Sequence, residues 1–415
     1  MNKFIYNIYF FSIFLLLMLG PHAWFMWIFE IPGLGILKTV LCLVVSIICF
    51  IYYKSNSIKL CKDNHVLVGL VVLIVALVVS QGVGIKSIIR NLCVVFPLWV
   101  IISDKKNAER LLKRIVIILT LILLPGIIIH LYLLLGGKLP GTLIIHPYSS
   151  VYAFTNYIFL LKGAAAYEAD GIRFQSIFLE PGYLGTLLAF LLYSIRYDFR
   201  RFKSGWGLLV SLLLSLSMAG YVLGLLGFVL FRWSQRLSIK RLIVLSVFLS
   251  LGVIIAKDYN SGRNIVNEKL LNRFELDREN GIKGNNRVGD GTNFYFERAM
   301  RDGSFLFGLG SERINKINGG KGWQSDADYS SQIRGAGYKI FILYNGLFLA
   351  LLYAFAYYMI GIGGTRDKRY VVGYLIVVLA TFLQAAYPDS YSWLIPFILG
   401  IGVTDEKRQK RKSIN

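Results

Sequence analysis

Residues Ile115–Gly136 have the sequence IVIILTLILLPGIIIHLYLLLG, a run without a single Asp, Glu, Lys or Arg. A helix of about 20 apolar residues is long enough to cross the hydrocarbon core of a bilayer. The whole chain has this character, because 56% of its 415 residues are hydrophobic and only 16% are charged. This composition indicates an all-α polytopic membrane protein without a separate soluble domain.

Similar apolar runs recur along the chain and predict about twelve transmembrane helices. The first run is followed by Gly20, Pro21 and aromatic residues rather than by a small-residue cleavage site. We therefore interpret it as a retained helix and not as a signal peptide. The predicted helices cover residues 4–20, 34–53, 65–81, 86–103, 115–136, 179–195, 206–217, 218–231, 240–256, 338–361, 370–387 and 391–403.

The net charge of +22 is concentrated in alternate loops. Basic residues near the ends of transmembrane helices mark the cytoplasmic side. The pattern predicts a multi-pass protein of the cytoplasmic membrane with both termini in the cytoplasm, and it argues against a nucleic-acid partner. The basic clusters are Lys54/Lys59/Lys62, Lys105/Lys106/Arg110/Lys113/Arg114, Arg196/Arg200/Arg201/Lys203, Arg232/Arg236/Lys240/Arg241, Arg366/Lys368/Arg369 and Lys407 to Lys412.

The segment 206–231 allows two interpretations. Two helices of this length are shorter than the hydrocarbon core, and a single long helix fits the bilayer thickness better. A single helix, however, places the basic clusters on either side of it on opposite faces of the membrane. The charge pattern therefore favours a hairpin that turns near Ser215–Gly220, with Ser217 as the cap of the second helix.

These patterns divide the chain into helices 1–9 (1–256), a long external loop (257–337), helices 10–12 (338–403) and a basic tail (404–415). A second external loop covers 137–178. Within it the apolar run Val151–Leu161 is too short to span a membrane. It predicts either an interfacial or re-entrant piece that grips lipid, or a lid that packs on the helices.

The segment Arg173–Gly185, RFQSIFLEPGYLG, contains charges where an external loop enters a helix. Pro181 suits a first helical turn, and the helix dipole stabilises a carboxylate such as Glu180 at that end. Arg173 is near enough in sequence to pair with Glu180. The two residues form either a helix cap with a local ion pair or part of a substrate cavity.

Further charged residues are candidates for binding or chemistry. Arg90 lies at the external end of a helix, where it either reaches lipid phosphates or binds a diphosphate in the bundle. In the long loop Asp326 and Asp328 form either a solvated acidic turn or a general base for a sugar hydroxyl. Arg287 and Arg298 are candidates for holding phosphate; Arg298 belongs to NFYFERAMRDGSFLFGLG (Asn293–Gly310), which predicts a short amphipathic helix ended by glycines.

No cofactor or metal site is predicted. The four cysteines fall in predicted helices or a cytoplasmic loop, and the four histidines are scattered along the sequence. The spacing of these residues does not match a zinc site, and no phosphate-binding glycine motif follows a strand.

Two of these stretches resemble motifs of the O-antigen polymerase and O-antigen ligase superfamily. Arg173–Gly185 is similar to the Arg…Phe-x-Glu-Pro segment of many polysaccharide polymerases. Asp326 stands three residues before Tyr329 and eleven before Gly337, a spacing similar to the end of the long loop in these enzymes. Ligases of the superfamily carry His at this place, so Asp326 favours a polymerase.

The resemblance implies a GT-C-type transferase fold and a bacterial glycosyltransferase of the Wzy type. Such an enzyme transfers glycan from undecaprenyl diphosphate to another lipid-linked repeat unit outside the cytoplasmic membrane, and a chain-length regulator protein is a further expected partner. Asp326 or Asp328 would then act as base, Arg173, Arg287 and Arg90 would neutralise the diphosphate, and Glu180 would orient Arg173 or a sugar. The alternatives are a ligase that transfers finished polymer to lipid A core or protein, and a transporter or flippase without chemistry.

Overall fold

The computed structural model describes residues 3–31, 35–81, 85–147, 149–163, 172–234, 276–277, 281–282, 289–319, 332–333, 335, 337–365, 367–383, 385 and 387–403. These residues are mostly helical and belong to two compact units. The first unit comprises Met1–Gly227, Leu351–Ile376 and Pro388–Asn415. The second comprises Phe228–Ala350 and Val377–Tyr387.

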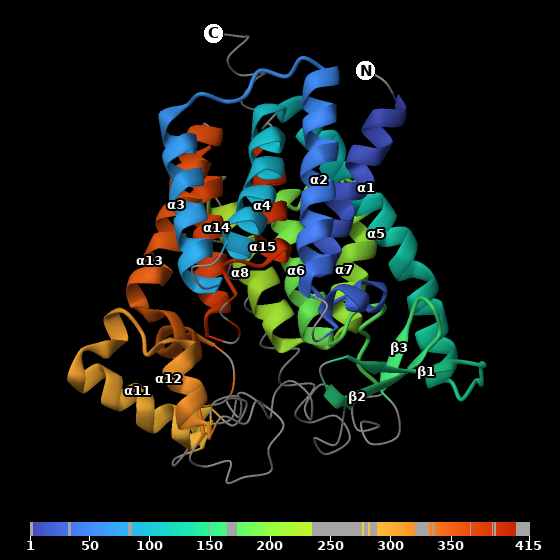
Figure 1. Ribbon diagram of the computed structural model, residues 1–415. Coiled ribbons are helices and arrows are strands. Elements are labelled where there is room, and N and C mark those ends of the chain that lie inside the picture. The colour runs from blue at the N-terminus through green and yellow to red at the C-terminus, as the bar shows by residue number, and fades with distance from the viewer. Residues whose placement is uncertain are drawn as a thin grey trace. The chain divides into compact units, whose positions relative to one another are not determined.

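The helices of the first unit run up and down between two ends (Figure 1). We name the end where α1 begins the upper end and the opposite end the lower end. The start of α1 and the end of α15 both lie at the upper end. The helices are α1 (Lys3–Leu19), α2 (Gly35–Ser55), α3 (Asn64–Gln81), α4 (Ile85–Ser103), α5 (Lys105–Leu134), α6 (Pro181–Ser194), α7 (Gly205–Leu214), α8 (Met218–Ser234), α13 (Tyr338–Gly364), α14 (Lys368–Thr381) and α15 (Tyr391–Ile401), of which α8, α13 and α14 continue into the second unit.

Apolar helices of this kind make the chain a membrane-embedded protein. Among the described residues, Ile36–Ser55, Lys105–Leu134 and Tyr338–Gly364 are long and apolar enough to cross a bilayer, and the other apolar helices are shorter. Every predicted transmembrane range overlaps one of these helices except 240–256, which lies outside the described residues. The count of twelve crossings and the GT-C fold remain predictions.

The predicted hairpin at 206–231 is confirmed. Helices α7 and α8 are separated by a turn in which Leu216 has a φ of 44°. The Ser217 hydroxyl accepts a hydrogen bond from the Gly220 N–H at 3.2 Å, which is the cap expected from the sequence. The backbone N–H of Ser217 in turn donates to the Ser215 hydroxyl at 3.2 Å.

Helices α6 and α15 form the centre of the first unit. From Leu187 to Ser194 every residue of α6 is buried, and α6 packs against α15 and α7. A helix that is apolar on all sides, as α6 is, needs such an all-round covering. Its 14 residues span only about 21 Å at 1.5 Å per residue. The short helix α6 thus lies at the centre of the first unit and connects Glu180 at the lower end with Arg196 at the upper end.

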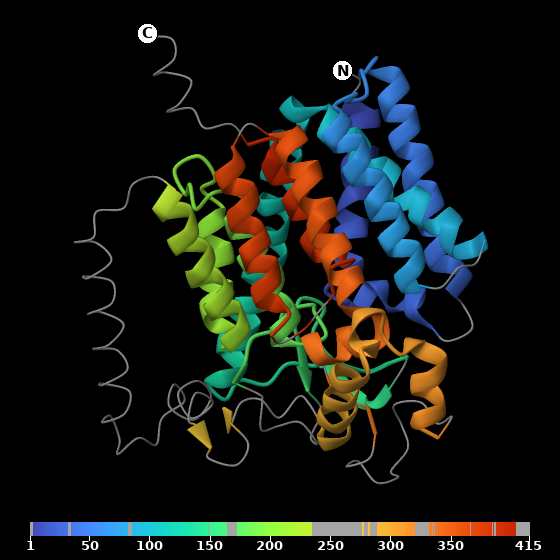
Figure 2. The same cartoon turned by 90° about the vertical axis from the view of Figure 1, so that its left-hand side faces the viewer.

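The lower end carries a small antiparallel sheet and a 3-10 helix, which lie beside each other in both views (Figures 1 and 2). The strands β1 (Thr142–His146), β2 (Ser149–Asn156) and β3 (Leu161–Gly163) are in the order β1-β2-β3, and η1 covers Trp24–Glu30. Most of the apolar run Val151–Leu161 is therefore strand β2 and not a re-entrant piece. Phe154 of β2 and Leu161 are buried with Trp27 and Leu179, which supports the predicted packing lid.

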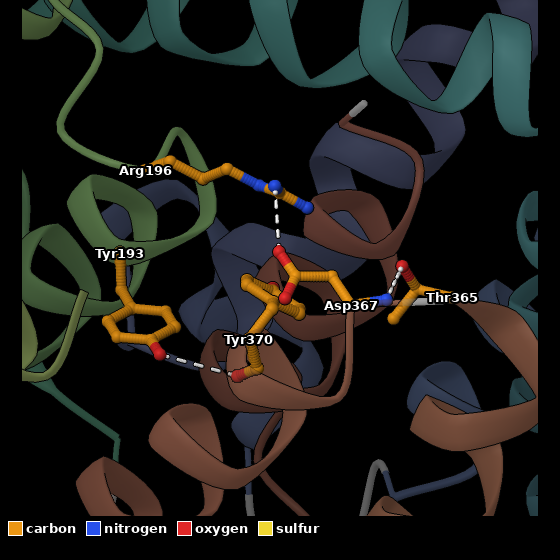
Figure 3. Close-up of polar contacts among 5 residues, drawn as sticks. All are labelled: Tyr193, Arg196, Thr365, Asp367 and Tyr370. Atoms are coloured by element: carbon orange, nitrogen blue, oxygen red, sulfur yellow. Dashed lines mark hydrogen bonds and ion pairs between the residues drawn. The ribbon is translucent and has the colours of Figure 1, made fainter. Parts of the chain in front are cut away.

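At the upper end, two arginines pair with carboxylates. The Arg196 guanidinium donates to the Asp367 carboxylate at 3.0 Å and lies 5.4 Å from the centre of the Tyr370 ring (Figure 3). Arg196 and Tyr197 have φ angles of 58° and 51°, so the turn at the end of α6 is strained. The ion pair of Arg196 with Asp367 holds this turn in place. Arg201 makes a second, bidentate ion pair, in which two guanidinium nitrogens donate to the two carboxylate oxygens of Glu109 on α5.

The second unit contains β4 (Leu276–Asp277), β5 (Gly281–Ile282), α11 (Asp290–Asp302), η5 (Ser304–Leu306), α12 (Gly310–Ile317), the first part of α13 and the last part of α14. The predicted amphipathic helix is confirmed as α11, which ends at Gly303 with a φ of 77°. Helix α13 differs from the continuous helix expected for 338–361. It is interrupted at Gly346, whose φ of 80° and ψ of 161° are not helical.

Candidate active site at the lower end of the first unit

Glu180 lies where the sequence predicts it, directly before the first residue of α6. Its backbone is extended and Pro181 occupies the first helical position. The carbonyl of Glu180 accepts hydrogen bonds from the N–H groups of Tyr183 and Leu184, at 3.1 and 3.3 Å. The Glu180 carboxylate makes no capping hydrogen bond to the helix, and the residue is only partly buried. The main chain therefore starts the helix, and the carboxylate is not used as its cap.

Backbone hydrogen bonds bring three distant segments of the chain to this place. Ala23 pairs with Phe178, and the Trp24 N–H donates to the Ile177 carbonyl at 2.9 Å. The Leu161 N–H donates to the Ser176 carbonyl at 2.7 Å. The turn before η1 and strand β3 thus both pair with the segment that leads to Glu180.

Aromatic and imidazole rings gather beside the start of α6. The His22 ring lies 5.0 Å from the Tyr183 ring and 6.5 Å from the His146 ring, measured between ring centres. The Trp27 ring lies 4.8 Å from His146, and the Trp27 indole N–H donates to the His22 carbonyl at 3.0 Å. His146 and Trp27 are buried, whereas His22 and Tyr183 are only partly buried. Within this cluster, His22 and Tyr183 thus keep some exposed surface.

His22 holds a conformation that is unusual for its residue type. Its φ is 53°, in the left-handed region that non-glycine residues seldom occupy. Ser176 in the segment before Glu180 has a similar φ of 52°. Such strain is maintained only where the surrounding structure fixes it, and it is frequent at functional sites. Both strained residues belong to the segments that the backbone pairing joins.

Arg173 lies on the same segment as Glu180, and its neighbours in sequence are fixed by two helices. The Ile172 carbonyl is hydrogen-bonded to the His130 ring of α5 at 3.2 Å, and the Phe174 N–H donates to the Leu214 carbonyl of α7 at 3.1 Å. The charge of Arg173 acts on the Tyr221 hydroxyl at the start of α8. Arg173 is partly buried, so it is a cation held near the turn between α7 and α8.

Arg90 has different neighbours at the lower end. It lies on α4, and its charge acts on Tyr391 at the start of α15 and on Cys42 of α2. The charge of Lys38 also acts on Cys42. The partly buried Arg90 thus belongs to the helix bundle, and the charge of the neighbouring Lys38 adds to its positive field.

The remaining predicted site residues belong to the long loop. Asp326, Asp328 and Arg287 lie outside the described residues. Arg298 is an exposed residue of α11 in the second unit, where its charge acts on Asp302. Of the predicted set, Arg173 and Glu180 lie on one described segment, as their spacing in the sequence requires, and the structure adds His22, His146, Trp27 and Tyr183 as neighbours of that segment.

These additional residues were not selected from the sequence, because His22 and His146 are far apart along the chain. Tyr183 is part of the RFQSIFLEPGYLG stretch, and His22 follows Gly20 and Pro21 far upstream of it. Their proximity depends on the pairing of Ala23 and Trp24 with Ile177 and Phe178, which no local pattern shows.

Comparison with known proteins gives no match, whether with protein families, with curated proteins or with solved structures.

Proposed function

We propose that the protein is a membrane glycosyltransferase that polymerises lipid-linked oligosaccharide repeat units, such as those of O-antigen, capsule or exopolysaccharide. In this proposal the enzyme lies in the bacterial cytoplasmic membrane with both termini in the cytoplasm and its lower end outside. It transfers glycan from undecaprenyl diphosphate to another lipid-linked unit. The resemblance of Arg173–Gly185 and of Asp326–Gly337 to the polymerase motifs is the origin of the proposal.

The observation that supports it best is the set of groups beside Glu180. A sugar presents hydroxyl groups at its rim and C–H groups on its faces, so carboxylates and aromatic rings together suit it. The partly buried rings of His22 and Tyr183 stand next to the start of α6, and Glu180 keeps its carboxylate out of the helix cap. Binding sites commonly combine such apolar or aromatic walls with a few fixed polar groups.

The chemistry follows from the charges. When the glycosidic bond to the diphosphate breaks, negative charge develops on the leaving oxygen, and fixed cations stabilise that transition state. Arg173 and Arg90 would supply the positive charge from the first unit, with Arg287 as a further cation. Asp326 or Asp328 would accept the proton of the acceptor hydroxyl as general base. Glu180 would orient Arg173 or a sugar hydroxyl.

The test uses a host that lacks the gene and is complemented with single variants. Glu180→Gln removes the carboxylate charge with little change of shape and is expected to reduce polymer on gels at least about 100-fold, as loss of a transition-state contact does. Glu312→Gln on α12 is the matched control, because Glu312 is exposed and pairs with Lys316 at the surface. Equal polymer from both variants, at equal protein levels, would refute the proposed site.

The product of the deletion strain separates the related activities. Loss of a polymerase leaves acceptors that carry a single repeat unit. Loss of a ligase leaves finished polymer that is not attached to an acceptor, and loss of a flippase leaves the lipid-linked units on the cytoplasmic side of the membrane.

A further inference from the structure

The second unit contains a small helical domain with a core of its own. Helices α11 and α12, η5 and the first part of α13 surround the buried residues Ala299, Ile314, Ile333 and Leu343, and Phe305 and Leu309 pack against this core. The views of Figures 1 and 2 show α11 and α12 beside the start of α13. The Lys339 ammonium, on α13, donates to the Asn293 side chain of α11 at 2.6 Å.

The domain is fastened to α13 by a close backbone contact at two glycines. Gly308 and Gly346 both have a φ of 80°, which favours glycine. A Cβ atom added to Gly346 would lie 2.4 Å from the Phe307 carbonyl carbon, and one added to Gly308 would lie 2.7 Å from the Gly346 nitrogen. The Leu309 N–H also donates to the Leu343 carbonyl at 2.7 Å. The segment 306–309 is therefore fixed against α13 at its interruption.

The interruption at Gly346 also marks the length of α13 that fits a bilayer. The residues from Leu347 to Gly364 extend about 27 Å at 1.5 Å per residue. This is close to the hydrocarbon thickness of about 30 Å. Phe348, which is 54% exposed, lies in the first turn of this stretch.

The apolar residues next to this contact point away from the core of the domain. Phe305 packs inside, whereas Leu306 and Phe307 are 44% and 75% exposed. The Phe307 ring lies 6.1 Å from the Phe348 ring. The exposed surfaces of Leu306 and Phe307 are therefore continuous with the exposed ring of Phe348, at the start of this stretch of α13.

From this continuity we infer that Leu306 and Phe307 form a membrane anchor that is immersed at the lipid interface. The occupant of this apolar surface is the phospholipid bilayer, at the depth of the first acyl carbons. Aromatic and aliphatic side chains on short interfacial segments bind bilayers in this way, with charged residues kept toward the headgroups. The anchor would hold the domain at a fixed height above the bilayer, whichever reaction the protein catalyses.

The experiment places a small fluorophore on the full-length chain reconstituted in phosphatidylcholine and phosphatidylglycerol vesicles. Phe307→Cys and, in a second sample, Leu306→Cys carry the label, and Lys316→Cys on the exposed side of α12 is the matched control. The unsubstituted chain, whose cysteines are mostly buried, gives the background of labelling. Two quenchers are compared: a lipid with a nitroxide at acyl carbon 5, and aqueous iodide.

Labels at 306 and 307 are expected to be quenched by the nitroxide lipid and to be several-fold less sensitive to iodide than the label at 316. Equal iodide quenching at 307 and 316 would overturn the inference, since both positions would then face water. Protection of 307 from both quenchers would also overturn it, because protein and not lipid would cover the surface. If Phe307→Cys does not fold, the same outcomes are decided by Leu306→Cys.

Discussion

The two ends of the first unit use their polar residues differently. At the upper end Arg196 is paired with Asp367 and Arg201 with Glu109, and the Arg196 side chain is buried. At the lower end, the Glu180 carboxylate does not cap α6, and the partly buried rings of His22 and Tyr183 lie 5.0 Å apart, measured between ring centres, at the start of that helix. The described contacts of the upper end are thus ion pairs, whereas those at the start of α6 are ring contacts and backbone hydrogen bonds.

We therefore expect the two ends of α6 to contribute differently: the upper end mainly to stability and the lower end, under the proposed function, mainly to activity. Helix α6 joins Glu180 at the lower end to the strained turn of Arg196 and Tyr197 at the upper end. Substitutions at the upper end should mainly reduce the free energy of unfolding. Substitutions at the lower end should mainly reduce activity.

The largest loss of stability is expected for Arg196→Ala. The change leaves the mostly buried Asp367 carboxylate without its cation and removes the contact with the Tyr370 ring. Breaking a buried ion pair from one side costs about 3–5 kcal/mol, and about 3 kcal/mol is reasonable here because Asp367 keeps some access to water. Thermal unfolding of the purified protein in detergent measures the effect.

The control for this prediction is Arg200→Ala, which removes an exposed arginine from the same turn. It should change stability by less than about 0.5 kcal/mol. Similar unfolding of the two variants would mean that the Arg196–Asp367 pair does not hold the upper end. Combining Arg196→Met with Asp367→Asn should recover much of the loss, since no unpaired charge is then buried.

At the lower end, His22→Asn is expected to lower activity about tenfold and stability by only about 1 kcal/mol, since one partly buried ring is lost. Asparagine tolerates the left-handed backbone of His22, so the change removes the ring contacts with Tyr183 and His146 without added strain. The measurement is polymer formed by the complemented host, together with thermal unfolding.

His65→Asn at the upper end is the matched control, because His65 is exposed and should leave activity unchanged. Loss of activity in both variants would contradict the prediction that only the lower end contributes to activity. A normal level of polymer from His22→Asn would remove His22 from the proposed site but would not affect the prediction for Arg196.

The sequence predicted the positions of the described helices well because long apolar runs can be recognised directly, even where the helix, as in α6 and α7, is shorter than a bilayer-spanning one. It also predicted the start of α6 at Pro181 and the cap at Ser217, since both are local features. It did not predict strand β2, because the apolar run Val151–Leu161 fits a strand as well as an interfacial piece. The interruption at Gly346 was missed because it depends on the close approach of Gly308, far away in the sequence.

The sequence predicted only those residues of the candidate site that lie close together along the chain. Arg173 and Glu180 share one short segment, and a proline in the first helical turn makes such a segment recognisable. The cluster of His22 and His146 arises from pairing between chain segments about 120 to 150 residues apart, which an unaligned sequence does not reveal.

A smaller effect is expected at the turn between α7 and α8, where the lower end is held by a cap and not by an ion pair. Ser217→Ala removes the acceptor of the Gly220 N–H and should cost about 1 kcal/mol. Ser211→Ala in α7 is the control, because its hydroxyl donates to the Gly207 carbonyl four residues earlier and that bond contributes little to a helix. Equal losses for the two serines would show that the cap does not hold the hairpin.

The smallest effect concerns Asp63 at the upper end, in the loop before α3. Burial raises the pKa of Asp63, but the hydrogen bonds from the Val66 and His65 N–H groups and the His65 ring together lower it by more. The net shift of the pKa is therefore downward. A carboxylate with a lowered pKa stabilises the fold above about pH 4, and this contribution is lost as the pH falls through the lowered value. Asp63→Ser keeps a capping oxygen but does not titrate. Thermal unfolding between pH 5 and pH 3 should therefore decline less steeply in the variant than in the native chain, and parallel curves would mean that the cap at this end does not depend on charge.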